Sequence, residues 1–208
     1  MEKFLNSLPQ LVILLFSIVF HEVAHGQVAL WRGDPTAKQH GRLTLNPIPH
    51  IDPFGTILFP LLLIVTRSPV MFGWARPVPI NPLNFRKIKK DMALVGASGP
   101  ASNFLLAIVA SLLCRWSVAA LGPFHILSRT LIFAVSINLM LAVFNLIPIP
   151  PLDGSRIVVG FLPDRAAARF LQIERYGFVL LFALLFFGLF DSILFPVVNV
   201  LFRVLLGG

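Results

Sequence analysis

Residues 9–31 of this chain read PQLVILLFSIVFHEVAHGQVALW, an apolar run of 23 residues that contains the motif His21-Glu22-Val23-Ala24-His25. As a helix this run measures roughly 34 Å, which is enough to cross a bilayer. Ionisable side chains at membrane depth are costly and are usually functional. The run therefore predicts a membrane-spanning helix that carries a polar functional site.

The composition of the whole chain supports a membrane protein. Of its 208 residues 57% are apolar and only 12% are charged, and the mean hydropathy is +0.85, whereas soluble domains have roughly 45–50% apolar and about 25% charged residues. The net charge of +8 would also suit a nucleic-acid partner, but the basic residues gather in short loops between apolar segments. We therefore expect the lipid bilayer as a partner and no nucleic acid.

Two further stretches, 93–113 and 131–151, are long and apolar enough to span the membrane, whereas 54–65 is too short and contains a proline. The apolar stretch 176–206 fits either one tilted helix or a hairpin of two short ones. The sequence thus predicts an all-α polytopic membrane protein, a single membrane-embedded domain over residues 1–208. Its core helices are about 9–31, 93–113 and 131–151.

Basic residues predict the orientation. Nine Lys and Arg lie between Trp31 and Asp91 and four lie between Asp153 and Tyr176, against one before the first span and two in 114–130. The positive-inside rule then places the two basic regions in the cytoplasm and the N-terminus outside. This holds only if 54–65 does not cross, so we interpret 54–72 as re-entrant or interfacial.

Residues 41–47, GRLTLNP, alternate like a short strand bounded by Gly and Pro. A strand with an open edge could pair with an extended substrate, and an ordinary loop is an equal alternative. With 54–72 this gives a re-entrant or β-like membrane-associated element over about 41–72.

The metal-binding motif needs a partner. On a helix, His21 and His25 lie on one face and can reach one ion, as in zinc hydrolases, while Glu22 lies beside them to polarise a water. Tetrahedral zinc requires a third protein ligand. Asp153 is the best candidate, because the prolines before it unwind the third span at membrane depth. Asp52 stays an alternative.

HEVAH, the later sequence Asn145-Leu-Ile-Pro-Ile-Pro-Pro-Leu-Asp153-Gly154 and the sequence Gly99-Pro-Ala-Ser-Asn103 resemble, in this order, the site-2 protease family of intramembrane zinc metalloproteases. The resemblance covers residues 9 to about 160. It implies one zinc ion held by His21, His25 and Asp153, with Glu22 as the general base.

The resemblance also implies cleavage of a peptide bond in or near the transmembrane segment of membrane-protein substrates, as in regulated intramembrane proteolysis. It implies that Asn145 positions substrate or stabilises the oxyanion, with a related role for Asn103. Many members carry a PDZ or cystathionine-synthase-type domain, and this chain resembles the compact members without them. We expect a multi-pass protein of a prokaryotic cell membrane, with the active site toward the cytoplasm.

Two other functions compete with this interpretation. An intramembrane metal or proton transporter would use the same His and carboxylate groups, and a non-catalytic relative would only bind membrane segments. The complete ligand set and the intact Glu22 count against the second. The sequence leaves the substrate, the regulatory signal and the oligomeric state open.

Overall fold

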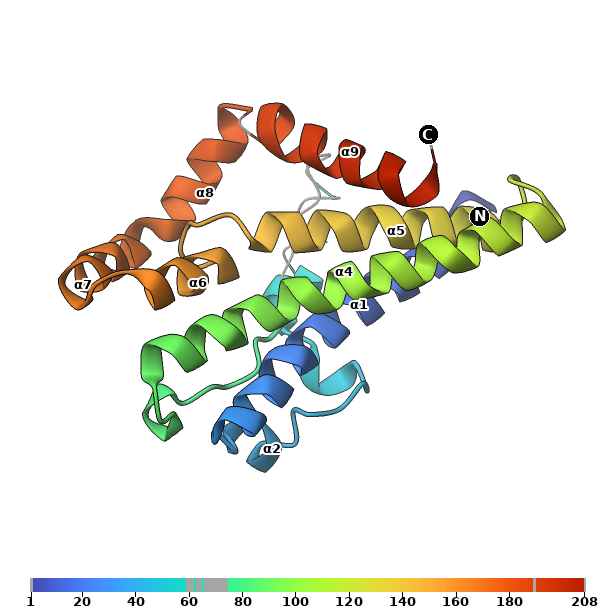
Figure 1. Cartoon of the computed structure of the whole chain (residues 1–208). Coiled ribbons are helices and arrows are strands. Elements are labelled where there is room, and N and C mark those ends of the chain that lie inside the picture. The colour runs from blue at the N-terminus through green and yellow to red at the C-terminus, as the bar shows by residue number, and fades with distance from the viewer. Residues whose placement is uncertain (1, 59–61, 63–64, 66–74, 189, 208) are drawn as a thin grey trace.

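Three long helices form the centre of the molecule. The structure, a computed structural model, describes residues 2–58, 62, 65, 75–188 and 190–207. Helix α4 (Ile88–Leu121) packs against both α1 (Glu2–Arg32) and α5 (Ile126–Asn145) (Figure 1). Among the described residues these are the three helices long and apolar enough to cross a membrane, and none of those residues forms a strand. The predicted all-α polytopic fold is confirmed.

The observed helix ends differ from the predicted ones. Helices α1 and α4 extend beyond 9–31 and 93–113 at both ends, and the charged residues at both ends of α1 and at the start of α4 are part of the helices. Helix α5 begins at Ile126, where the His125 side chain accepts a hydrogen bond from the Leu127 N–H at 3.2 Å. It ends at Asn145 instead of reaching 151, because the following prolines lack the N–H that a helix needs.

Short elements connect α1 to α4: α2 (Thr36–Gln39), η1 (Ile48–His50), η2 (Pro53–Leu58, one π-helical turn) and η3 (Pro82–Asn84). Residues 41–47 form turns and bends, so of the two alternatives for this stretch the loop is observed and the strand is not. The Arg42 side chain donates instead to the carbonyl oxygen of Arg76 at 2.6 Å. Most of the predicted re-entrant stretch 54–72 (59–61, 63–64 and 66–72) lies outside the described residues.

The chain leaves α1 and re-enters α4 at the same end of the bundle. Arg32 at the end of α1 pairs with buried Asp91 in the first turn of α4 at 2.6 Å. Just after α1, the Asp34 carboxylate accepts hydrogen bonds of 2.7 Å from Asn81 N and Asn84 Nδ2. Burial would raise the pKa of Asp34, but these bonds and those from Thr36 together lower it. The segment between α1 and α4 thus starts and ends on one side, as the orientation argument requires.

After α5 the described residues form α6 (Asp153–Phe161), α7 (Asp164–Leu171), η4 (Gln172–Tyr176), α8 (Gly177–Phe186), η5 (Phe190–Leu194) and α9 (Phe195–Leu206). Helix α6 packs against α4 so closely that a Cβ at Gly160 would overlap the Ala93 side chain. Helix α8 leads away from α7 and α9 returns along α5 (Figure 1). Of the two alternatives for 176–206, two short helices are observed in place of one tilted helix, although they do not lie side by side as in a hairpin.

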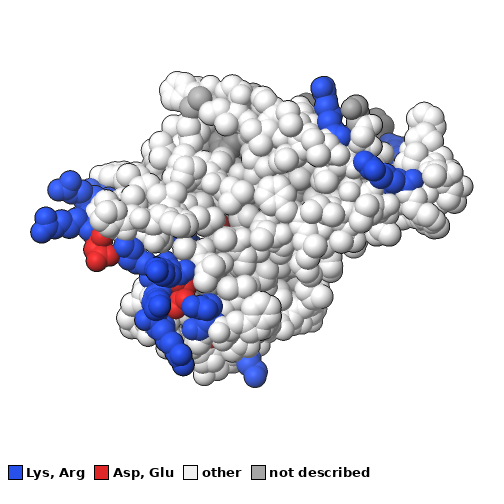
Figure 2. Space-filling model, viewed as in Figure 1, with Lys and Arg blue, Asp and Glu red and all other residues white. Residues whose placement is uncertain are grey.

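Small residues let the long helices approach each other. The main core joins Ala107 and Ala110 of α4 to Ala134, Leu139 and Val135 of α5, with Val198 of α9 packed on them. Small side chains at such interfaces allow the close packing that holds membrane helices together. Lys and Arg gather at the end of the molecule where α7 and the start of α4 lie, with smaller groups at the other end (Figure 2).

Candidate metal centre

His21, His25 and Asp153 meet inside the bundle, on α1 and at the start of α6. All three are buried, with 7%, 4% and 7% of their surface exposed. The two Nε2 atoms are 3.0 Å apart, and each lies 3.1 Å from Asp153 Oδ2. The structure thus brings together three ligand atoms that could hold one metal ion, from residues 132 positions apart in the sequence.

The hydrogen bonds of the two imidazoles show that this group fits a cation. His21 Nδ1 lies 2.6 Å from Asn103 Oδ1 and His25 Nδ1 lies 2.7 Å from the carbonyl oxygen of Val95. Both partners are acceptors, so each Nδ1 carries the hydrogen and each Nε2 turns a lone pair toward the carboxylate. Three acceptor atoms that face one another need a positive charge between them. Their spacing is near the roughly 3.3 Å expected around tetrahedral zinc with bonds of about 2.0 Å.

Glycines allow α4 to pack directly against the two imidazoles and α6 to pack against the backbone that precedes it. Gly99 of α4 lies against the two imidazoles, and a Cβ there would overlap ring atoms of both His21 and His25. Gly154 lies against the carbonyl of Leu146, so a Cβ there would overlap the backbone that turns from α5 to α6. The glycines of both motifs are therefore needed for packing around the ligands.

Asp153 also forms an ion pair through its other carboxylate oxygen. Its Oδ1 lies 3.7 Å from Arg156 Nη1, one helical turn further along α6. Sequence reasoning did not single out Arg156, although its position three residues after Asp153 places it on the same face. Asp52, the alternative ligand, instead accepts hydrogen bonds from the backbone N–H groups of Phe54 and Gly55 at 3.0 and 2.7 Å, so it caps η2.

Glu22 contacts a proline-rich segment that lies within the basic stretch between Trp31 and Asp91. Its Oε2 accepts a hydrogen bond from Val78 N at 2.8 Å. Val78 belongs to residues 75–81, which we call the strap. Arg76 N donates to His50 O at 2.9 Å and Asn81 N donates to Asp34 at 2.7 Å, so the strap is fixed on both sides of Glu22. The run of prolines at 77, 79 and 82, which keeps the backbone extended, is the signal for it in the sequence.

Asn103 lies beside the ligands, with contacts that differ from the role implied by the resemblance. Its Oδ1 faces His21, and its Nδ2 donates to Asn138 Oδ1 at 2.9 Å and to Ser17 O at 3.3 Å. Asn138 Nδ2 in turn donates to Ser17 Oγ at 2.9 Å. The amide hydrogens of Asn103 are thus engaged within the protein and are not directed at a substrate. Asn138 and Ser17 escaped notice, although a buried amide in an apolar helix is itself a signal.

Asn145 is the last residue of α5, and its Nδ2 donates to Leu141 O of the same helix at 2.9 Å. It is half-buried. The oxyanion role implied for it stays a prediction.

Comparison with known proteins gives consistent matches. The family model for peptidase family M50 matches residues 117–188. The protein YwhC of Bacillus subtilis (strain 168) is 41% identical over 209 residues, which covers 96% of this chain and 92% of YwhC. Rip2 of Mycolicibacterium smegmatis (strain ATCC 700084 / mc(2)155) is 29% identical over 82% of this chain and 64% of Rip2. The names of these relatives propose a zinc metalloprotease in each case. No solved structure matches.

Proposed function

The chain belongs to peptidase family M50, as a multi-pass membrane zinc metalloprotease, and from this premise we propose that it hydrolyses a peptide bond in or near the transmembrane segment of membrane-protein substrates. One observation carries the proposal. The buried group His21, His25 and Asp153 has both histidines and the neighbouring Glu22 on α1, a helix long enough to cross a bilayer, and Asp153 comes to them from the short helix α6.

We assign His21, His25 and Asp153 as the zinc ligands. Zinc held there would lower the pKa of a bound water and supply a nucleophile near neutral pH. Glu22 follows His21 directly on α1, and its Oε2 is held by Val78 N–H. Glu22 Oε1 then accepts a proton from the nucleophile and passes it to the leaving nitrogen of the cleaved peptide bond. The positive charge of Arg156 and the imidazole hydrogen bonds keep the ligands in place meanwhile.

The position of the centre suits a substrate in the membrane. His25 lies six residues before Trp31, which is about 9 Å along the helix, and Trp31 is exposed as expected for a residue at the interface. The nearby end of the bundle carries the largest group of Lys and Arg (Figure 2), and the positive-inside rule places that end in the cytoplasm. We therefore propose that the site opens toward the cytoplasmic side of a prokaryotic cell membrane.

Cleavage by the purified chain tests this assignment. Wild type and Glu22→Gln are compared on a panel of single-span membrane proteins in detergent or proteoliposomes, and zinc is measured in both. We expect both to contain one zinc per chain and only wild type to cleave. Glu174→Gln, a matched change at an exposed site, should cleave like wild type. Undiminished cleavage by Glu22→Gln would refute Glu22 as the base, and zinc absent from wild type would refute the metal centre.

A further inference from the structure

Helix α7 lies along the chain between α6, which carries Asp153, and the apolar helix α8. Helix α6 begins at Asp153, and only two residues, Leu162 and Pro163, separate its end from α7. After η4, the apolar helix α8 begins directly beyond Tyr176. Helix α7 thus lies where the chain turns back toward the apolar region, at the basic end of the molecule (Figure 2).

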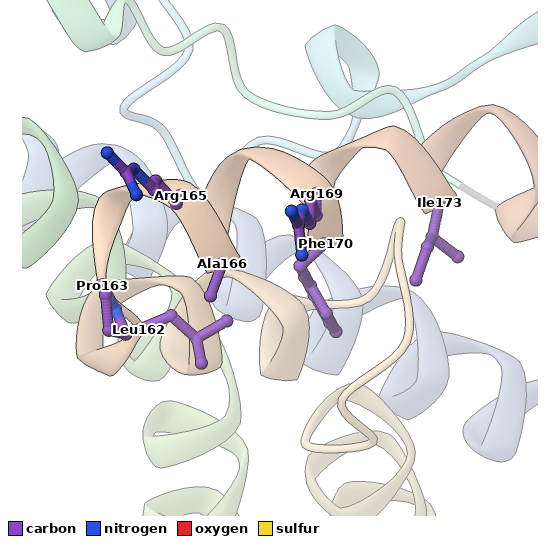
Figure 3. A pocket seen from close by; sticks show the side chains of 7 residues that line it. All are labelled: Leu162, Pro163, Arg165, Ala166, Arg169, Phe170 and Ile173. Carbon is purple, nitrogen blue, oxygen red and sulfur yellow. The ribbon is translucent and has the colours of Figure 1, made fainter.

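Two kinds of side chain run beside each other along α7. Arg165 and Arg169 are four residues apart and therefore share one face, while Ala166 and Phe170 have the same spacing on the adjacent face, and Leu162 precedes the helix. With Ile173 they line an open hollow of about 700 Å³ (Figure 3). A basic face next to an apolar face is typical of helices that lie in the membrane interface.

The two arginines are available for an external anion. The neighbouring Asp164 carboxylate is bound by Lys89 Nζ at 2.8 Å, which also lowers the pKa of Asp164. No carboxylate within the part of the chain that the structure describes forms an ion pair with Arg165 or Arg169. The apolar lining of the hollow is also partly uncovered, with Ile173 41% exposed. An exposed apolar surface beside unpaired positive charge matches a ligand with both an acyl chain and an anionic headgroup.

We propose that the hollow on α7 binds one anionic phospholipid of the surrounding bilayer, with its phosphate at Arg165 and Arg169 and an acyl chain on Leu162, Phe170 and Ile173. The charge of both arginines and the position of α7 just before the apolar helix α8 favour this occupant. Because α7 follows α6 so closely, a bound lipid also restrains the helix that carries Asp153.

Lipid retention by the full-length chain tests the proposal. The protein is purified in detergent, mixed with equal amounts of phosphatidylglycerol and phosphatidylcholine, and the lipids that remain bound are counted by native mass spectrometry. Wild type should retain one phosphatidylglycerol in preference to phosphatidylcholine. The double variant R165Q/R169Q should lose this preference, since each arginine near the surface contributes about fivefold in affinity for an anionic lipid.

The control is R115Q/R129Q, which removes two exposed arginines from the opposite end of the bundle. It should keep the preference of wild type. Phe170→Ser should weaken retention of both lipids, because it removes the apolar contact and leaves the charges. Thermal unfolding of each variant shows that it is folded. Unchanged retention in R165Q/R169Q, or an equal loss in R115Q/R129Q, would overturn the proposal.

Discussion

Asn103 Oδ1 of α4 lies 2.6 Å from Nδ1 of His21 on α1, and both side chains are buried. This contact fixes which nitrogen of His21 carries hydrogen and therefore which nitrogen is left for a metal. Asn103 is itself oriented by Asn138 of α5. The state of one ligand thus depends on amides from the two other long helices.

Asn103→Leu should lower zinc affinity by about 10- to 100-fold, because the hydrogen-bonding partner of a ligating histidine contributes about that much. Asn138→Leu should have a smaller effect in the same direction, since Asn103 would keep its bond to Ser17 O. Zinc retained against a chelator series measures both. Ser136→Ala is the matched control on α5, because that hydroxyl bonds only within its own helix. Equal zinc retention in Asn103→Leu and wild type would refute the orienting role.

Gly99→Ala should destabilise the protein by roughly 1–3 kcal/mol and reduce zinc binding, because the added Cβ overlaps both imidazole rings and displaces them. Zinc content and the melting temperature in detergent measure the two effects. Ala101→Ser changes an exposed position on the same helix and should alter neither. A Gly99→Ala protein that binds zinc normally would show that α4 can move away from the histidines without cost.

The sequence predicted that His21, His25 and Asp153 come together and that three long helices are present, and the histidine pair and the helices leave local signals. The spacing of His21 and His25 and the length of the apolar runs are visible without tertiary structure. Asn103 was identified but its role was not, because the role depends on which way an amide faces. Asn138 lies in a different helix from its partners, and no local pattern links it to Ser17, 121 positions away.

The strap was missed for a related physical reason. Proline-rich, extended backbone carries no periodicity, so its place is decided by distant partners such as Asp34 and His50. The ends of α4 were underestimated because hydropathy marks where the apolar part of a helix stops. Its first turn is charged, yet it is helical, and Asp91 there accepts a hydrogen bond from Lys87 N at 2.9 Å.

Val78→Pro tests whether the strap positions Glu22. It removes the N–H that binds Glu22 Oε2 and so should reduce kcat by about 10- to 100-fold, the equivalent of one hydrogen bond to a charged group. Zinc content should not change, because this hydrogen bond joins Val78 to Glu22 and to none of the three proposed zinc ligands. Val78→Ala keeps the N–H and is the control, with kcat expected within a few-fold of wild type. A similar kcat for Val78→Pro and Val78→Ala would show that the contact with Glu22 does not contribute.

His50 makes the stability of the protein depend on pH, because this residue is only 1% exposed and its Nε2 donates to Thr44 O at 3.0 Å. Burial is the main cause that lowers the pKa of His50 below its ordinary value of 6.5; the hydrogen bond to Thr44 O opposes it, Arg42 adds to the lowering, and Glu22 has the smallest, opposite effect. The folded state therefore binds this proton less readily than the unfolded state does. The resulting stability is present above pH 6.5 and is lost as the pH falls toward the lowered pKa.

Melting temperatures in detergent between pH 8 and pH 5 should thus fall more steeply for wild type than for His50→Gln. The glutamine does not titrate but can still donate to Thr44 O. At pH 8 the variant should lose only about 1 kcal/mol, the usual contribution of a neutral hydrogen bond. His125→Gln, at an exposed cap, should follow the wild-type curve. Parallel curves of melting temperature against pH for wild type and His50→Gln would mean that protonation of His50 does not limit the stability of the protein.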